Sequence, residues 1–428
     1  MEMLQTVVRA WRVPELRKKM IFTLLMLIIF RIGSNIPVPG INRDALAQMF
    51  QSGQGLFEIF NLFSGGSFGN MTIFALSITP YITASIILQL LTIAVPSLEA
   101  LSKEGLEGRK KITSYTRYLT VALALVQAVG LTVGLFRSAL ISTDIMSIII
   151  IVLVLSAGTT FLMWLGEQIN ENGIGNGISL IIFGGIIARV PGQLGTTIQN
   201  ARSGETSSMT ITLFIIFAVV VILGIIEIQQ GQRRIPVQYA KRVVGRKMYG
   251  GQATHIPLKV NQAGVIPIIF AMSLLQFPMT ITYFTGTNTG FGQWVNKYLS
   301  LNGSPGVWIY CGFYIVLTFF FTYFYTAVTF KPDEVADNLK QNGGFIPGIR
   351  PGNATVEYLT KVMNRVTFVG AVFLSVVAVL PTAVGGITGI TSLYFGGTSL
   401  LIAVGVALDT MKQLEQRMVM RNYTGFLK

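Results

Sequence analysis

Ten apolar stretches constrain this chain more than any other feature of its sequence. Each is close to the roughly 20 residues that a helix needs to cross the ~30 Å hydrocarbon core of a membrane. Because backbone N–H and C=O groups in hydrocarbon must be bonded within the protein, these stretches are expected to be helices. They cover residues 20–37, 72–94, 118–136, 146–166, 178–198, 209–229, 263–284, 307–329, 366–384 and 391–409. The chain is therefore expected to be an all-α integral membrane protein with ten transmembrane helices.

Charged residues are scarce and unevenly placed. They make up 12% of the 428 residues, against about 25% in soluble domains. With the N-terminus inside, 26 of the 32 Lys and Arg residues fall in the inner segments and 4 in the outer loops. Basic residues gather on the cytoplasmic side of membrane proteins, so both termini are predicted to be cytoplasmic.

Ten spans divide into two sets of five, which gives the halves opposite orientations. Residues 1–204 are expected to form an N-terminal half with spans 1–5, and residues 205–428 a C-terminal half with spans 6–10. The second half contains two long cytoplasmic loops, 230–262 and 330–365, and a cytoplasmic tail, 410–428. Long ordered loops are usually functional.

One apolar stretch, at about 55–66, is too short to span a membrane. A short helix at membrane depth must be shielded by protein or line a cavity. Two interpretations stay open from the residues alone: a re-entrant plug, or an interfacial helix on the outer surface.

Several kinds of chemistry are not predicted. The single histidine, His255, lies in a loop, so a Ser–His or HExxH site within the bilayer is not expected. Glu227 and Asp409 lie at the ends of spans rather than near the midplane, where coupled transporters place ionisable groups. The sequence predicts no enzyme activity, no metal site and no cofactor, and it leaves a small-solute secondary transporter as the alternative to a channel.

Isoleucines occupy the middle of several spans. Ile78, Ile82 and Ile86 are four residues apart and share one helix face. Ile182, Ile269 and Ile402 lie at comparable depths in other spans rich in small or polar residues. Such side chains could simply face lipid, or they could form an apolar constriction that gates by dewetting.

The second and seventh spans combine prolines with polar side chains. Pro80, Pro267 and Pro278 favour kinks. The polar side chains could bond weakly across helices, by ~0.6–2 kcal/mol each, or act as ordinary helix contacts.

Eleven motifs, in order along the chain, resemble one family. They are FRIG (30–33), IPVPGI (36–41), FNLFSGG (60–66), TPYITASI (79–86), GRKKI (108–112), WLGEQI (164–169), GIGNGIS (173–179), GQRRIP (231–236), ADNLK (336–340), GFIPGIRPG (344–352) and FGGTSLLI (395–402). The sequence resembles the SecY family, the central subunits of the bacterial protein-translocation channel, over essentially its whole length.

The resemblance implies an hourglass channel between two inverted five-helix halves, with a short re-entrant plug helix. It implies a pore ring of Ile78, Ile82, Ile182, Ile269, Leu400 and Ile402. It implies plug residues Leu56, Phe57, Ile59, Phe60, Asn61, Leu62 and Phe63. It implies a lateral gate that includes Thr83, Ile86, Gln89, Ile266, Ser273 and Gln276. It implies docking of a motor or ribosome at Arg242, Arg246, Lys247 and Arg350.

The resemblance also implies the biological setting. The expected location is the bacterial plasma membrane. The expected partners are the small subunits SecE and SecG, the SecA ATPase, the ribosome, signal peptides, nascent polypeptides and the lipid bilayer. The expected function is a passive pore that passes unfolded polypeptides and releases apolar segments laterally into lipid.

Overall fold

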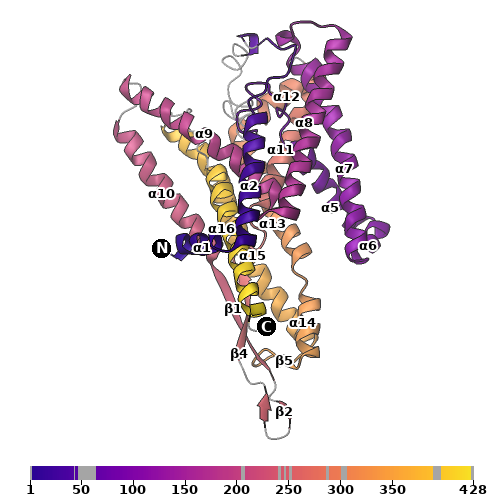
Figure 1. The fold of residues 1–428 in the computed structure, drawn as a ribbon, viewed down its shortest axis with the longest axis vertical. Coiled ribbons are helices and arrows are strands. Elements are labelled where there is room, and N and C mark those ends of the chain that lie inside the picture. Colours follow the sequence, from indigo (N-terminus) through magenta and orange to yellow (C-terminus); the bar gives the residue numbers. More distant parts are fainter. Residues whose placement is uncertain are drawn as a thin grey trace.

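The computed structural model describes residues 2–42, 44–46, 64–203, 208–239, 242–244, 247–249, 253–285, 289–299, 306–388 and 397–425. Most of these residues are helical, and the long helices run roughly along the longest axis of the molecule (Figure 1). Each of the ten predicted spans overlaps one of these helices, which confirms the helical membrane fold.

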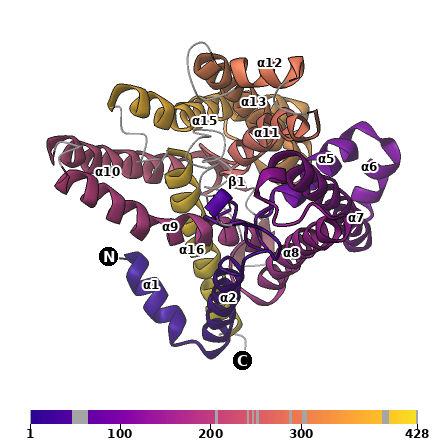
Figure 2. The same ribbon diagram turned by 90° about the horizontal axis from the view of Figure 1, so that it is seen from above.

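The described elements of the chain up to residue 203 are all helical. The elements are α1 (Glu2–Trp11), α2 (Pro14–Gly33), α5 (Thr79–Ala94), α6 (Pro96–Lys103), α7 (Leu106–Val129), η1 (Gly130–Leu135), η2 (Arg137–Ala139), α8 (Ile145–Asn172) and α9 (Gly177–Arg202). Seen along the bundle, α5, α7 and α8 lie together on one side (Figure 2).

The C-terminal part adds more helices and all of the strands. The helices are α10 (Ser208–Gln230), α11 (Ile266–Thr285), α12 (Gly290–Tyr298), α13 (Gly306–Thr329), α14 (Pro332–Gln341), α15 (Asn353–Thr388) and α16 (Gly397–Gly425). Helices α11, α13 and α15 pack in sequence beside one another (Figure 2). The predicted boundary between the halves, at 204/205, lies outside the described residues.

Length and composition alone mark fewer spans than the ten predicted. Within the described residues, four helical stretches are long and apolar enough to cross a membrane: Leu106–Leu135, Ile145–Asn172, Gly306–Gln341 and Asn353–Leu380. A fifth is the pair α5 and α6, which meet at an angle of 99°. The bend falls at Val95, where extended backbone precedes Pro96, because proline disfavours helical backbone in the residue before it.

The long loop 230–262 forms a β ribbon, which the sequence analysis did not assign. β1 (Gln232–Tyr239) pairs antiparallel with β4 (Ala253–Lys259), in a register from Gln232↔Lys259 to Gln238↔Ala253. β5 (Gly344–Phe345) pairs with the other edge of β1. At the far end, β2 (Arg242–Val244) pairs with β3 (Lys247–Tyr249). The ribbon projects beyond the helices at one end of the molecule (Figure 1).

Alternation along β1 anchors the ribbon. Ile235 and Val237 are buried, whereas their neighbours along the strand are exposed. The two side chains join an apolar cluster with Leu339 of α14 and Leu359 of α15. Successive side chains of a strand point to opposite faces, which explains this period of two. The buried face of β1 therefore packs the ribbon against α14 and α15.

The two ends of the chain meet at the end of the bundle that carries the ribbon. Ala10 and Leu16 pack with Ile174 and Leu414 in one small apolar cluster. The Arg417 Nη1 donates a hydrogen bond of 2.9 Å to the carbonyl oxygen of Gly173. α1 and the C-terminal part of α16 therefore lie on one side of the molecule.

Candidate functional site

Isoleucines from three segments close a narrow space in the middle of the bundle. A cavity of about 10 Å³ is lined by Ser77, Ile78, Thr79, Ile82, Ile182, Ile269, Met272, Ser273 and Gln276. A single water molecule needs roughly 10–15 Å³ of such space. The cavity therefore has room for about one water molecule, and the isoleucines lie close around it. We call this set of side chains the constriction.

The local sequence explains how these isoleucines are placed. Ile78 immediately precedes α5, and the Ile82 N–H donates to its carbonyl oxygen at 3.0 Å. Ile182 comes from α9 and Ile269 from the first turn of α11. All four side chains are at most 9% exposed. Four of the five isoleucines that the family resemblance implies for the ring thus line one cavity.

The other two predicted ring residues lie in α16. Leu400 and Ile402 are buried and belong to the same apolar cluster as the four isoleucines. Ser77 and Met272, by contrast, line the constriction without having been predicted. Met272 lies three residues after Ile269 on α11, so helical spacing from the predicted residue could have indicated it.

The predicted gate residues divide between two places. α5 and α11 are in contact, and Ser273 and Gln276 line the constriction itself. Ile86 is buried in the same apolar cluster. Ile266 lies elsewhere, at the rim of a second cavity.

The hydroxyl and amide groups of α5 bond within their own helix. The Thr83 Oγ1 donates to the Thr79 carbonyl oxygen at 3.0 Å, and the Gln89 Nε2 donates to the Ser85 Oγ at 3.3 Å. Such bonds do not connect α5 to its neighbours. That the polar side chains of the second and seventh spans form the lateral gate stays a prediction.

A wide polar cavity lies where the β ribbon joins the bundle. Its volume is about 500 Å³, and we call it the vestibule. It is lined by residues of α9, α10, β1, β4, α11, α13 and α16, by the residue before α9 and by the turn between β4 and α11. These residues are Asn176, Ser179, Gln229, Gln230, Gln232, Lys259, Asn261, Gln262, Ala263, Gly264, Val265, Ile266, Tyr325, Val406, Asp409, Thr410, Lys412, Gln413 and Gln416. Ile266 and Val406 are each within four residues of ring residues on the same helices. The vestibule is therefore positioned next to the constriction.

Three charged residues line the vestibule: Lys259 of β4, and Asp409 and Lys412 of α16. The Lys412 Nζ donates to the Gln229 carbonyl oxygen at 3.4 Å. Burial lowers the pKa of Lys412, and the positive charge of Lys259 lowers it further, whereas Asp409 and Glu415 act in the opposite direction. Burial removes water that would stabilise the ammonium group.

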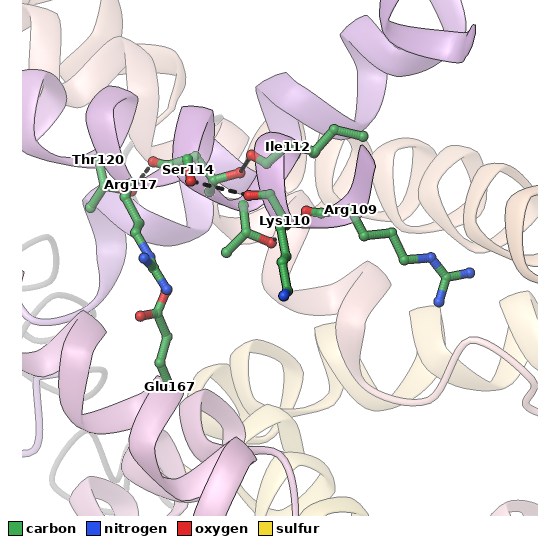
Figure 3. A network of polar contacts seen from close by, with 9 residues as sticks. Arg109, Lys110, Ile112, Ser114, Arg117, Thr120 and Glu167 are labelled. Atoms are coloured by element: carbon green, nitrogen blue, oxygen red, sulfur yellow. Dashed lines mark hydrogen bonds and ion pairs between the residues drawn. The ribbon is translucent and has the colours of Figure 1, made fainter. Parts of the chain in front are cut away.

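An ion pair ties α7 to α8. The Arg117 Nε donates to the Glu167 Oε1 at 2.8 Å, as the close-up shows (Figure 3). On the same helix, the Ser114 Oγ donates to the Lys110 carbonyl oxygen at 3.1 Å. The side chains of Arg109 and Lys110 extend away from this ion pair (Figure 3).

The described residues offer no metal centre. Among them, no three His, Cys, Asp or Glu side chains gather as ligands for an ion. The candidate site thus consists of a narrow constriction lined mainly by isoleucines and a wider polar vestibule beside it.

Comparison with known proteins decides the family. The SecY family profile matches residues 72–411. The chain belongs to the SecY family. It is 48% identical over 444 residues to the protein translocase subunit SecY of Streptomyces galbus, and 49% identical over 438 residues to that of Halalkalibacterium halodurans. Each alignment covers 100% of both chains. The resemblance drawn from the motifs is confirmed.

Solved structures show the same SecY fold at lower identity. One described as a protein-conducting channel has a TM-score of 0.67 and 20% identity, and covers 96% of this chain and 97% of its own. Another, Sec61 in a canine ribosome–channel complex, has a TM-score of 0.63 and 19% identity, with the same coverage. The family is one of membrane channel subunits, which agrees with the prediction of a non-enzymatic pore and sets aside the small-solute transporter.

The remaining SecY-type predictions concern loops. Arg350 is exposed, in the turn between β5 and α15, where its carbonyl oxygen accepts a 2.9 Å hydrogen bond from the Thr355 Oγ1. Arg242 begins β2 and Lys247 begins β3, at the tip of the ribbon. Arg246 and all of the predicted plug residues, 56–63, lie outside the described residues.

Proposed function

We propose that this protein is the pore-forming subunit of a protein translocase, through which unfolded secretory polypeptides cross the plasma membrane. The observation that carries the proposal is the constriction, where four isoleucines from α5, α9 and α11 leave a cavity of about 10 Å³. Apolar rings exclude water and ions by dewetting. Because aliphatic side chains offer a passing chain no hydrogen bonds, they can close around it without binding it.

The two predicted gate helices favour lateral release into lipid. α5 contacts α11 directly beside the constriction. Contacts between membrane helices are weak, with polar bonds of ~0.6–2 kcal/mol each. We infer that an apolar segment of the substrate separates these helices and leaves between them, with Thr83, Ile86, Gln89, Ser273 and Gln276 along its exit.

The ribbon end of the molecule is proposed to face the cytoplasm and to receive the partners. Most Lys and Arg residues are assigned to this side by the positive-inside rule, and both chain ends lie there. Among similar structures is Sec61 in a ribosome–channel complex. We propose Arg242, Arg246, Lys247 and Arg350 as docking residues for SecA or a ribosome, and SecE and SecG as bound small subunits.

The lateral gate can be tested by tying α5 to α11. Cysteines replace Thr79 and Gln276, which line the same cavity, in a chain whose single cysteine is removed by Cys311→Ser. The pair is joined with a short crosslinker that a reductant cleaves. Translocation of a secretory precursor into proteoliposomes is expected to stop on crosslinking and to return on reduction. Unchanged translocation by the crosslinked protein would contradict the proposal.

Docking can be tested separately by reversing one charge. Arg350→Glu is expected to abolish SecA-driven translocation while the thermal unfolding of the protein stays the same. The matched control is Arg12→Glu, which reverses the charge of an exposed basic residue far from Arg350 in the sequence. Normal SecA-driven translocation by Arg350→Glu would remove this residue from the docking site.

A further inference from the structure

The segment that leads into the constriction is not helical. Residues 64–78 form a series of turns. Within them, 71–73 pair antiparallel with 36–38: the Val38 N–H donates to the Met71 carbonyl oxygen and the Ile73 N–H to the Ile36 carbonyl oxygen, both at 3.0 Å. The segment ends at Ile78, the first constriction residue. A contact that holds this segment in position therefore also holds Ile78 in position in the constriction.

Phe74 is the side chain that seats this segment against two helices. A Cβ built on Gly33 of α2 would lie 2.1 Å from the Phe74 Cε2, and one built on Gly158 of α8 would lie 1.9 Å from the Ile73 carbonyl oxygen. A side chain at Gly33 would push the Phe74 ring out of its place, and one at Gly158 would push against the backbone of the segment itself. The two glycines form a notch that accepts Phe74 and its backbone.

Aromatic contacts hold the ring inside this notch. Phe74 stacks on Phe30 of α2 and on Phe161 of α8, each at a centroid distance of 6.1 Å, with interplanar angles of 13° and 6°. Offset stacking at this distance adds to the stabilisation from burial. Phe74 is only 2% exposed and shares its apolar cluster with Ile78, Ile82 and Ile182.

The connection from Phe74 to Ile78 is short and tightly turned. The Ser77 N–H donates to the Phe74 carbonyl oxygen at 2.8 Å, and Ser77 has a φ of +53°. A residue other than glycine in this left-handed region is held there by its surroundings. With this turn fixed, a shift of the Phe74 ring is transmitted to Ile78.

We propose that Phe74 is a positioning residue for the constriction: seated between Gly33 and Gly158, it sets where Ile78 stands and thereby keeps the idle channel tight to ions. The proposal rests on the proposed function, because it requires that the constriction is the ion barrier. It assigns to α2 and α8, which supply no constriction residue, a share in closing the pore.

The test is the ion conductance of proteoliposomes that contain the idle protein. Phe74→Ala is expected to raise this conductance about tenfold, the factor that corresponds to ~1.4 kcal/mol. Phe74→Met, which refills the notch with a flexible apolar side chain, is expected to restore most of the tightness.

Leu359→Ala is the control for a general loss of packing. Leu359 is also fully buried, but it lies in the apolar cluster beneath the β ribbon, which contains no residue of the 64–78 segment or of the constriction. It is expected to lower the thermal unfolding temperature as much as Phe74→Ala does, without the leak. Equal leaks in the two variants would overturn the proposal.

A second variant changes the α2 side of the notch and leaves Phe74 in place. Gly33→Ala places a methyl group against the Phe74 ring and is expected to leak. Phe74→Ala removes the clash, so the double variant is expected to leak no more than Phe74→Ala alone, which is the non-additivity of contacting residues. Gly312→Ala in α13 is the control, because no described heavy atom lies within 4 Å of its added Cβ. A Gly33→Ala channel as tight as Gly312→Ala, or additive leaks in the double variant, would overturn the proposal.

A variant with both Ile82 and Ile182 replaced by glycine tests the barrier role of the constriction separately from the positioning role of Phe74. If this variant leaks and Phe74→Ala does not, the positioning role is wrong and the constriction stands. If neither leaks, the constriction is not the barrier, and both claims fall.

Discussion

Gly65 and Gly185 meet backbone to backbone: a Cβ built on Gly65 would lie 2.7 Å from the Cα of Gly185. Gly185 lies in α9, three residues after the constriction residue Ile182. The beginning of the 64–78 segment is therefore packed against the same helix that supplies one wall of the constriction. Its later part is seated on α2 and α8 through Phe74.

Gly65→Ala is predicted to destabilise the protein more than Gly66→Ala. Both glycines have a positive φ, +64° and +93°, so each substitution strains the backbone by ~1–2 kcal/mol. Only Gly65 also meets α9, which adds ~1–3 kcal/mol of overpacking. Among the described residues, no heavy atom lies within 4 Å of a Cβ built on Gly66. Thermal unfolding in detergent measures the difference, and equal unfolding temperatures would show that α9 yields to the added methyl group.

The ion pair between Arg117 and Glu167 is predicted to contribute ~0.2–1 kcal/mol to the free energy of unfolding. The Arg117 side chain is 46% exposed, which limits the interaction, whereas Glu167 is 15% exposed. A double-mutant cycle with Arg117→Gln and Glu167→Gln measures the coupling, which is expected to shrink at high salt. A coupling above ~2 kcal/mol would mean that the pair is far less hydrated than its exposure indicates.

Lys412 is predicted to make stability depend on pH on the alkaline side. Its pKa in the folded protein is lowered by burial from the ordinary value of 10.5. Between the lowered pKa and 10.5 the unfolded chain binds a proton that the folded chain does not, so the free energy of unfolding rises with pH. Lys412→Gln, which removes the charge, is expected to unfold at a higher temperature than the wild type near pH 7. The gap is expected to close as the pH approaches 10.5, and a gap that widens would contradict the sign.

Sequence patterns predicted the helices well, because the membrane imposes a length and a polarity on each span. They were wrong about where the second helix begins. Residues 72–78 are as apolar as a span, yet they form the turned segment held by Phe74, and α5 begins at Thr79. Hydropathy reports the burial of this segment and not its backbone conformation.

The β ribbon was not predicted, although the sequence of β1 contains a pattern typical of a strand. Ile235 and Val237 alternate with exposed residues at a period of two, which is typical of a strand with one buried face.

Only some of the constriction residues could be predicted from the spacing and depth of side chains in the spans. The spacing of Ile78 and Ile82 and the depth of Ile182 and Ile269 indicated an apolar ring. Leu400 came from family resemblance alone, because leucine in a span ordinarily faces lipid or packs in the core. The notch at Gly33 and Gly158 is a tertiary contact between residues 125 positions apart, and no local pattern predicts it.

The most direct test of the central claim is the conductance of the idle channel after the constriction is widened. Replacing Ile82 and Ile182 with glycine removes two of the side chains that reduce the cavity to about 10 Å³. Proteoliposomes with this variant are predicted to pass ions well above the wild-type level, because a wider and wetter path no longer excludes water. A variant as tight as the wild type would contradict the assignment of these isoleucines as the barrier.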